Sequence, residues 1–216
     1  TQPNTRPFST DQWIALIFSI PWLEVLAQAY KLVRKLWQGL ADEGMYEVLE
    51  HESTIELLDR QGKKARFKKG QKVCYLQNNI IAFQDQGWSD GQSLLNYRCS
   101  PGVVVDKYRP GQKTYILISL RENKQRGDLD QFHISWSLKD AFRRSQEQWE
   151  TEISHRTRQL LVRLIFPKSR PPVRVWLGEY LRRRTRLLSD SLLQQLPDGR
   201  WQVEWKTKHP RLHERY

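Results

Sequence analysis

The sequence predicts a mainly β fold, either an immunoglobulin-like antiparallel β-sandwich or an open barrel, preceded by a helical segment. Beyond Met45 the apolar residues occur in short alternating or β-branched runs, separated by Gly, Pro and Asp turns. No helical pattern lies between these runs, which favours antiparallel pairing over a parallel α/β sheet. Nine Trp, eight Tyr and seven Phe supply large, flat side chains for a core.

The first 45 residues predict helices. Capping residues precede an apolar stretch from Trp13 to Ile20, and Pro21 favours a break after it. A second, amphipathic helix is expected from Trp22 to about Ala41, because apolar residues recur there every three or four positions. We therefore divide the chain into a helical segment, 1–45, and a β-sandwich-like domain, 46–216. The residues expected to face a partner or a membrane are Trp13, Trp22, Leu26, Val33, Leu36 and Trp37.

Two runs in the second part alternate strictly between apolar and polar residues, which is typical of half-buried strands. They are Phe132 to Leu138 and Trp201 to Lys206. Turns are expected at 101–102, 110–111, 127–128 and 197–199, where Pro, Gly and Asp cluster. Further strands are expected at 46–58, 65–76, 79–84, 113–122, 150–154, 158–166 and 173–180.

The chain carries a formal net charge of +12, which favours polyanions or anionic lipid as partners. Seven cations without an acid follow an acidic strand, and two interpretations stay open. On a hairpin turning at Gln61 and Gly62, opposite charges would pair across the two strands. Alternatively, the cations would form a phosphate-binding surface. The seven are Arg60, Lys63, Lys64, Arg66, Lys68, Lys69 and Lys72.

A second basic cluster comprises Arg182, Arg183, Arg184 and Arg186. Three consecutive arginines cannot all point the same way on a strand, so a loop or a strand end is expected. Polyanion binding is favoured if the two clusters form one patch, and disfavoured if acids lie between them. Aromatic residues beside cations, such as Tyr75 near Lys72, could stack nucleic-acid bases, but a place in the core is the more common role.

No catalytic, metal-binding or cofactor-binding residues are predicted. The sequence has no phosphate-binding loop, dinucleotide fingerprint or nucleophile elbow. His209 and His213 are four residues apart, but Pro210 argues against a shared helix face. The two cysteines, Cys74 and Cys99, lack any local sign of activation. A deep polar pocket joining His133 or His155 to Cys99 or an acid would favour an enzyme instead.

These observations support a non-enzymatic binding or adaptor module that recognises a partner, with the N-terminal helices mediating assembly or self-association. Two alternatives stay open: a nucleic-acid-binding protein that uses the basic clusters, and a peripheral membrane protein anchored by the N-terminal helix. Two cysteines are too few for a disulfide framework, and no signal peptide is evident, so a cytoplasmic location is expected; the membrane alternative implies a membrane-peripheral one. No small-molecule cofactor is expected.

Overall fold

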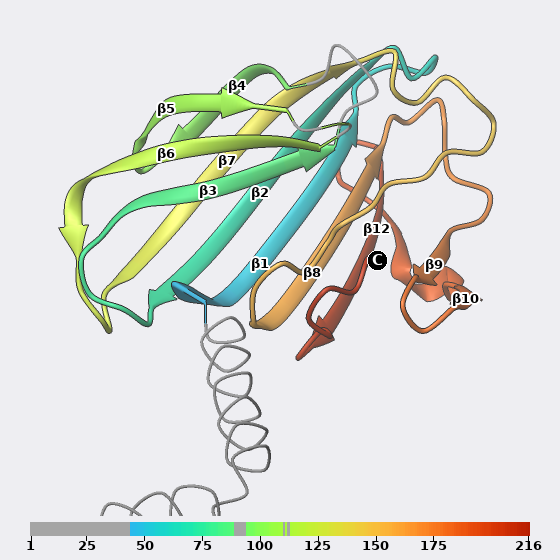
Figure 1. Ribbon diagram of the computed structural model, residues 1–216. Helices are drawn as coiled ribbons and strands as arrows, with labels where there is room; N and C mark the ends of the chain where they lie inside the picture. Colours follow the sequence, from blue (N-terminus) through green and yellow to red (C-terminus); the bar gives the residue numbers. More distant parts are fainter. Residues whose placement is uncertain (1–43, 89–93, 110, 112) are drawn as a thin grey trace, which may run out of the picture. The chain divides into compact units, whose positions relative to one another are not determined.

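The computed structural model describes residues 44–88, 94–109, 111 and 113–216, and the structural statements below concern these residues. They form three β-sheets, none of which closes on itself, so the expected mainly β class is confirmed (Figure 1). The predicted helices, with Trp13, Trp22, Leu26, Val33, Leu36 and Trp37, lie outside the described residues. The predicted division at residue 45 therefore stays a prediction.

The largest sheet has seven strands. In spatial order they are β11 (Leu193–Gln195), β12 (Trp201–Lys208), β8 (Thr157–Phe166), β1 (Tyr46–Leu57), β2 (Lys64–Tyr75), β7 (Leu129–Lys139) and β4 (Leu95–Ser100). A three-stranded sheet contains β3 (Ile80–Trp88), β6 (Lys113–Lys124) and β5 (Val103–Tyr108). A two-stranded sheet pairs β9 (Trp176–Glu179) with β10 (Arg184–Leu187), and a 3₁₀ helix, η1 (Asp190–Leu192), precedes β11.

The strand β2 has two different faces, because successive side chains of a strand point to opposite sides of the sheet. Its odd-numbered residues are buried, among them Phe67, Val73 and Tyr75. Its even-numbered residues, including Arg66 and Lys68, are on the other face and stay accessible. The seven-stranded sheet therefore has an inner face that builds the core and an outer face that is mostly polar.

The three-stranded sheet packs against the inner face, over β2 and β7 (Figure 1). Phe83 of β3 stacks on Phe132 of β7 with ring centroids 4.0 Å apart, and Tyr46 of β1 lies 5.2 Å from Phe83. An ion pair between Lys69 of β2 and Asp85 of β3 joins the same two sheets inside this core. Aromatic packing and one buried pair of charges thus hold the sheets together.

The seven-stranded sheet is not purely antiparallel, which corrects the expectation from the sequence. β8 pairs parallel to β1, with Thr54 opposite Arg163. β7 runs in the same direction as β1, since each pairs antiparallel with β2. β7 and β8 thus point the same way, so the connection 140–156 runs from the end of β7 back to the opposite end of the sheet, where β8 begins.

The expected strand at 150–154 is absent, which is a second correction. Backbone groups there bond to the C-terminal residues instead, with the Thr151 N–H donating to the Tyr216 carbonyl at 2.8 Å and only one isolated bridge, between Glu152 and Arg215. The strands β4, β5, β10 and β11 were not expected. They have three to six residues each, too few for a clear alternation of apolar and polar side chains.

The hairpin between β1 and β2 turns where the sequence predicts, at Gly62. Gly62 has a φ of +70°, and a Cβ on it would lie 1.7 Å from the Phe142 carbonyl oxygen. We predict that Gly62→Ala lowers the free energy of unfolding much more than Gly111→Ala. Gly111 has a similar φ, +74°, but no described heavy atom within 4 Å of the added Cβ.

The control should lose only the strain of the left-handed backbone, about 1–2 kcal/mol. Gly62→Ala should lose about 1–3 kcal/mol more, because a backbone carbonyl must move. Urea unfolding followed by tryptophan fluorescence measures both values. Equal losses in the two variants would contradict the close packing of the turn against Phe142.

Candidate functional site

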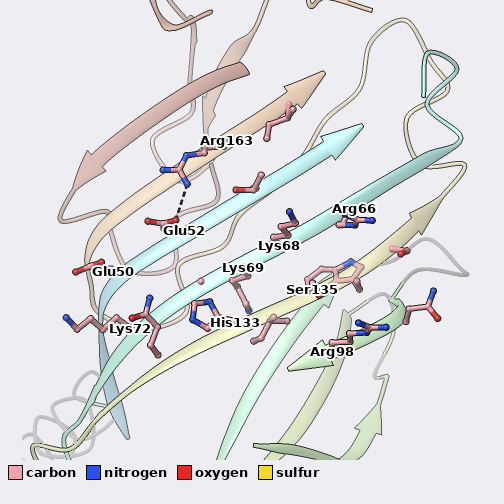
Figure 2. A pocket seen from close by; sticks show the side chains of 18 of the residues that line it. Glu50, Glu52, Arg66, Lys68, Lys69, Lys72, Arg98, His133, Ser135 and Arg163 are labelled. Atoms are coloured by element: carbon pink, nitrogen blue, oxygen red, sulfur yellow. Dashed lines mark hydrogen bonds and ion pairs between the residues drawn. The ribbon is translucent and has the colours of Figure 1, made fainter. Parts of the chain in front are cut away.

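The outer face of the seven-stranded sheet forms a broad polar depression of about 1050 Å³, which we call the outer hollow (Figure 2). Side chains from six strands line it. Lys69, Ile134 and Trp136 also border it, but only through their backbone atoms, because their side chains are buried on the inner face. The outer-face lining comprises Glu50, Glu52, Thr54, Arg66, Lys68, Gly70, Lys72, Asn96, Arg98, Gln131, His133, Ser135, Ser137, Arg163, Ile165 and Gln202.

The strand register aligns the central residues in one row across the sheet. Ser135 of β7 pairs with Lys68 of β2 on one side and with Arg98 of β4 on the other. Two cations therefore flank a hydroxyl group, about 9–10 Å apart as set by two strand spacings. Arg66 and Lys72 extend the charge along β2 in both directions from Lys68 (Figure 2). We call Arg66, Lys68, Lys72 and Arg98 the basic strip.

The acids of β1 are held mainly by cations of other strands. Glu52 bonds to Arg163 at 3.0 Å, and Arg163 also bonds to Glu204 at 2.7 Å. Glu56 pairs with Arg200 and lies 3.8 Å from Lys68. Of the charge pairing expected between β1 and β2, the described residues thus show a single long contact, that between Glu56 and Lys68.

Apart from Lys68, the cations of the basic strip make no ion pair with a carboxylate of the described residues. Within the described part of the chain, no carboxylate oxygen lies within 4 Å of Arg66, Lys72 or Arg98, although Glu50 pairs with Lys72 in the register. These cations remain available to an anion in solution.

The first predicted cluster is divided by the two-residue period of β2. Arg66, Lys68 and Lys72 line the outer hollow, whereas Lys69 is only 9% exposed and faces the core. Lys64 begins β2 and is exposed, as are Arg60 and Lys63 in the preceding turn. Lys69 is therefore not part of the candidate binding surface, which corrects its prediction as a polyanion-binding residue.

The second predicted cluster does not join the outer hollow. Arg182 and Arg183 lie in the turn between β9 and β10, while Arg184 and Arg186 are on β10, and all four are exposed. The two clusters thus belong to different sheets and do not form one patch, so the condition that would favour polyanion binding through both clusters is not met. The residues that complete the surface around β2, Arg98 and Ser135, come from strands that only the folded register brings together.

A second cavity, of about 1060 Å³, lies on the inner face. Two histidines line it, His51 and His155, together with five acids, so histidines and acids do share a pocket there. The acids are Asp85, Asp140, Glu147, Glu150 and Glu152. Two of these acids, Asp85 and Glu152, have lysine partners. Asp85 is bound to Lys69 and accepts a hydrogen bond from the Tyr97 hydroxyl at 2.8 Å. Glu152 is bound to Lys113 at 2.8 Å. Both carboxylates are thus engaged by other groups in the described structure.

Burial shifts the pKa of two histidines that line this cavity and of a cysteine packed against the core. Burial and the nearby charge of Lys69 lower the pKa of His51 to about 3. Burial, followed by the charges of Lys69 and His213, lowers the pKa of His155 to about 4. Burial and Asp85 raise the pKa of the Cys99 thiol to about 11, so this thiol is not activated as a nucleophile.

Within the described ranges, no three His, Cys, Asp or Glu side chains come together as a metal ion would require. In the same part of the chain, no helix has the length and apolar character to span a membrane.

No protein-family model matches the sequence, and neither does any curated protein. Among solved structures, the chain is similar to an M1 zinc metallopeptidase from Deinococcus radiodurans, with a TM-score of 0.39, 10% identity, and coverage of 74% of this chain and 38% of that one. It is also similar to aminopeptidase A from Legionella pneumophila in complex with aspartic acid, with a TM-score of 0.44, 12% identity, and coverage of 79% and 21%. The chain spans well under half the length of either protein, and at these TM-scores the likeness carries no functional argument.

The lowered pKa values predict how stability depends on pH. An unfolded histidine has a pKa of about 6.5, so below that pH the unfolded chain binds protons that folded His51 and His155 do not. The free energy of unfolding should therefore fall as the pH drops from about 6.5 toward 4. Each histidine contributes a slope of up to about 1.4 kcal/mol per pH unit. Urea unfolding of the wild type and of His51→Gln, repeated between pH 7 and pH 4, measures this dependence.

The glutamine variant cannot take up the proton, so its curve should be flatter than that of the wild type by about one proton. Carboxylates contribute equally to both curves, and the difference in slope isolates His51. Parallel curves would show that His51 is not held neutral in the folded chain.

Proposed function

We propose that this chain is a non-enzymatic binding module that holds an extended polyanion in the outer hollow. The observation that carries the proposal is the basic strip, in which Arg98 and Lys68 face each other across Ser135. Arginine, lysine and hydroxyl side chains are the groups that most often contact phosphate oxygens in proteins. The charge of +12 on the whole chain would attract such a partner over a longer range.

The absence of enzymatic activity is part of the proposal and rests on the inner cavity. Two of the carboxylates that line it beside His155, those of Asp85 and Glu152, are already bound to lysines, and two others, those of Asp140 and Glu150, are paired with arginines. A general base needs a free carboxylate or imidazole within hydrogen-bond reach of its proton. The low pKa of His155 also makes it a weak base.

The proposal extends to the N-terminal segment, the cellular setting and the form of the fold. Assembly or self-association through the segment 1–45 concerns residues outside the described ranges, as does membrane attachment through the same segment. A cytosolic setting is supported by the two free thiols, Cys74 and Cys99. We infer a β-sandwich of two unequal sheets from the packing of Phe83 on Phe132, while an immunoglobulin-like form stays a prediction.

We predict that removing one charge of the basic strip weakens polyanion binding. Lys68→Gln and Arg98→Gln should each lower the affinity for an inorganic polyphosphate chain about threefold to tenfold at 0.1 M salt. Each should also reduce the slope of log affinity against log salt by about one, because one fewer phosphate is neutralised. Calorimetric titration at several salt concentrations gives both quantities.

Arg184→Gln and Arg186→Gln are matched controls, since they remove the same charge from exposed positions on β10, outside the outer hollow. They should change affinity less than twofold. An equal loss in all four variants would mean that only net charge matters. If polyphosphate does not bind the wild type, the proposed function is wrong.

A further inference from the structure

We propose that the polyanion is the sugar–phosphate backbone of a nucleic-acid duplex, and that one of its phosphates sits directly over Gly70. This inference rests on the proposed function, because it names the partner of the same outer hollow. Three features support it: the two-dimensional layout of the cations, the lack of aromatic and apolar side chains, and a glycine that the fold itself does not require.

The basic strip extends in two directions. From Arg66 to Lys72 it covers seven residues of β2, which span about 20 Å at the usual rise of a strand. Arg98 lies two strands away from that line, at about 9–10 Å. A single-stranded nucleic acid has one phosphate backbone and would need only one line of cations. The two backbones of a duplex are separated by grooves about 6–12 Å wide, so they can engage β2 and β4 together.

The side chains of the outer hollow favour phosphate backbone over bases or protein. Among the outer-face residues that line it, Ile165 is the only hydrophobic one, and none is Phe, Tyr or Trp. Proteins that bind single strands usually stack bases on aromatic rings. Protein interfaces usually have an apolar core with few charges. Nucleic-acid interfaces are more polar and far more positive, as this surface is.

Gly70 occupies a position where the fold does not need a glycine. Its φ is not in the left-handed region, and a Cβ would meet only the Glu52 Cβ at an ordinary 3.7 Å. The pairing of β2 is regular at this point, with Gly70 opposite Glu52 and His133. A glycine inside a strand weakens it and often marks a bulge, a bend or the close approach of another group to the backbone. Gly70 has neither bulge nor bend and, unlike Gly178, lies between two cations of the basic strip, which points to the close approach of an anion.

The surroundings of Gly70 suit a phosphate. Lys68 and Lys72 lie two residues away on either side along β2, and His133 is the neighbour on β7 (Figure 2). The acid on the other side, Glu52, is bound to Arg163 at 3.0 Å, which offsets its repulsion of an anion. Glu50 lies opposite Lys72 and limits the site on the β1 side.

The decisive variant is Gly70→Ala in the full chain. The added methyl group fits the fold, so the unfolding midpoint should stay equal or rise. The same methyl group should prevent close approach to the backbone and lower the affinity for a 20-base-pair duplex about fivefold. Gly178→Ala is the matched control, because Gly178 is also in a strand, on β9, with no described heavy atom within 4 Å of the added Cβ. It should leave the affinity unchanged.

Four fluorescent probes separate the possible partners by anisotropy at 0.1 M salt: a DNA duplex, an RNA duplex, a single strand of equal length and polyglutamate of matched charge. We expect either duplex to bind at least tenfold more tightly than the single strand and polyglutamate. The difference between the two duplexes indicates which nucleic acid is the partner. Gly70→Ala should weaken binding of the tighter duplex only.

The outcomes distinguish this inference from the proposed function. If polyglutamate or the single strand binds as tightly as the duplexes, or if Gly70→Ala has no effect, the inference is wrong while polyanion binding stands. If none of the four probes binds while polyphosphate does, the inference is wrong and polyanion binding stands. If polyphosphate fails to bind as well, both are wrong. Lower affinity together with a lower unfolding midpoint in Gly70→Ala would assign the glycine to folding and overturn its role in binding.

Discussion

The two-residue period of β2 is the constraint on which both the core and the candidate surface depend. One strand buries Phe67, Val73 and Tyr75 on one side while it presents Arg66 and Lys68 on the other. A register shift of one residue would exchange these sets, burying cations without partners and exposing aromatic rings. The surface therefore exists only as long as the core fixes the register of β2.

A buried charge, that of Lys69, helps to fix the register of β2. Lys69 lies on the inner face, where its charge would be costly without a partner. Asp85 of β3 supplies the opposite charge, and the Tyr97 hydroxyl of β4 donates to the same carboxylate at 2.8 Å. Loss of one partner from such a buried pair typically costs about 3–5 kcal/mol. The pair thus constrains β2, β3 and β4 relative to one another, and with them the position of Lys68 on the opposite face.

Local pattern was sufficient to predict the long strands, but not their arrangement. The alternation from Phe132 to Leu138 predicted which face of β7 is buried, and Gly62 marked the first hairpin. The parallel pairing of β8 with β1 depends on where a long connection crosses the sheet, which no short sequence window records. The short β4, which places Arg98 beside Ser135, likewise has too few residues for a periodic signal. The candidate site was therefore predictable on β2 alone.

An acidic strand beside a basic one would normally cancel its neighbour's charge. The structure largely avoids this, because three of the four acids of β1 pair with cations from outside β2; Glu50, opposite Lys72, is the exception among the described residues. Arg158 bonds to Glu47 at 2.8 Å, and Arg163 and Arg200 hold Glu52 and Glu56 in the same way. Arg158 and Arg163 are on β8, and Arg200 immediately precedes β12, so β1 receives its neutralising charge from the side away from β2. The pairing order of the strands thus separates charge across the sheet. Because like charges along β2 repel one another in the absence of a ligand, an anion bound there would relieve repulsion that the fold leaves in place.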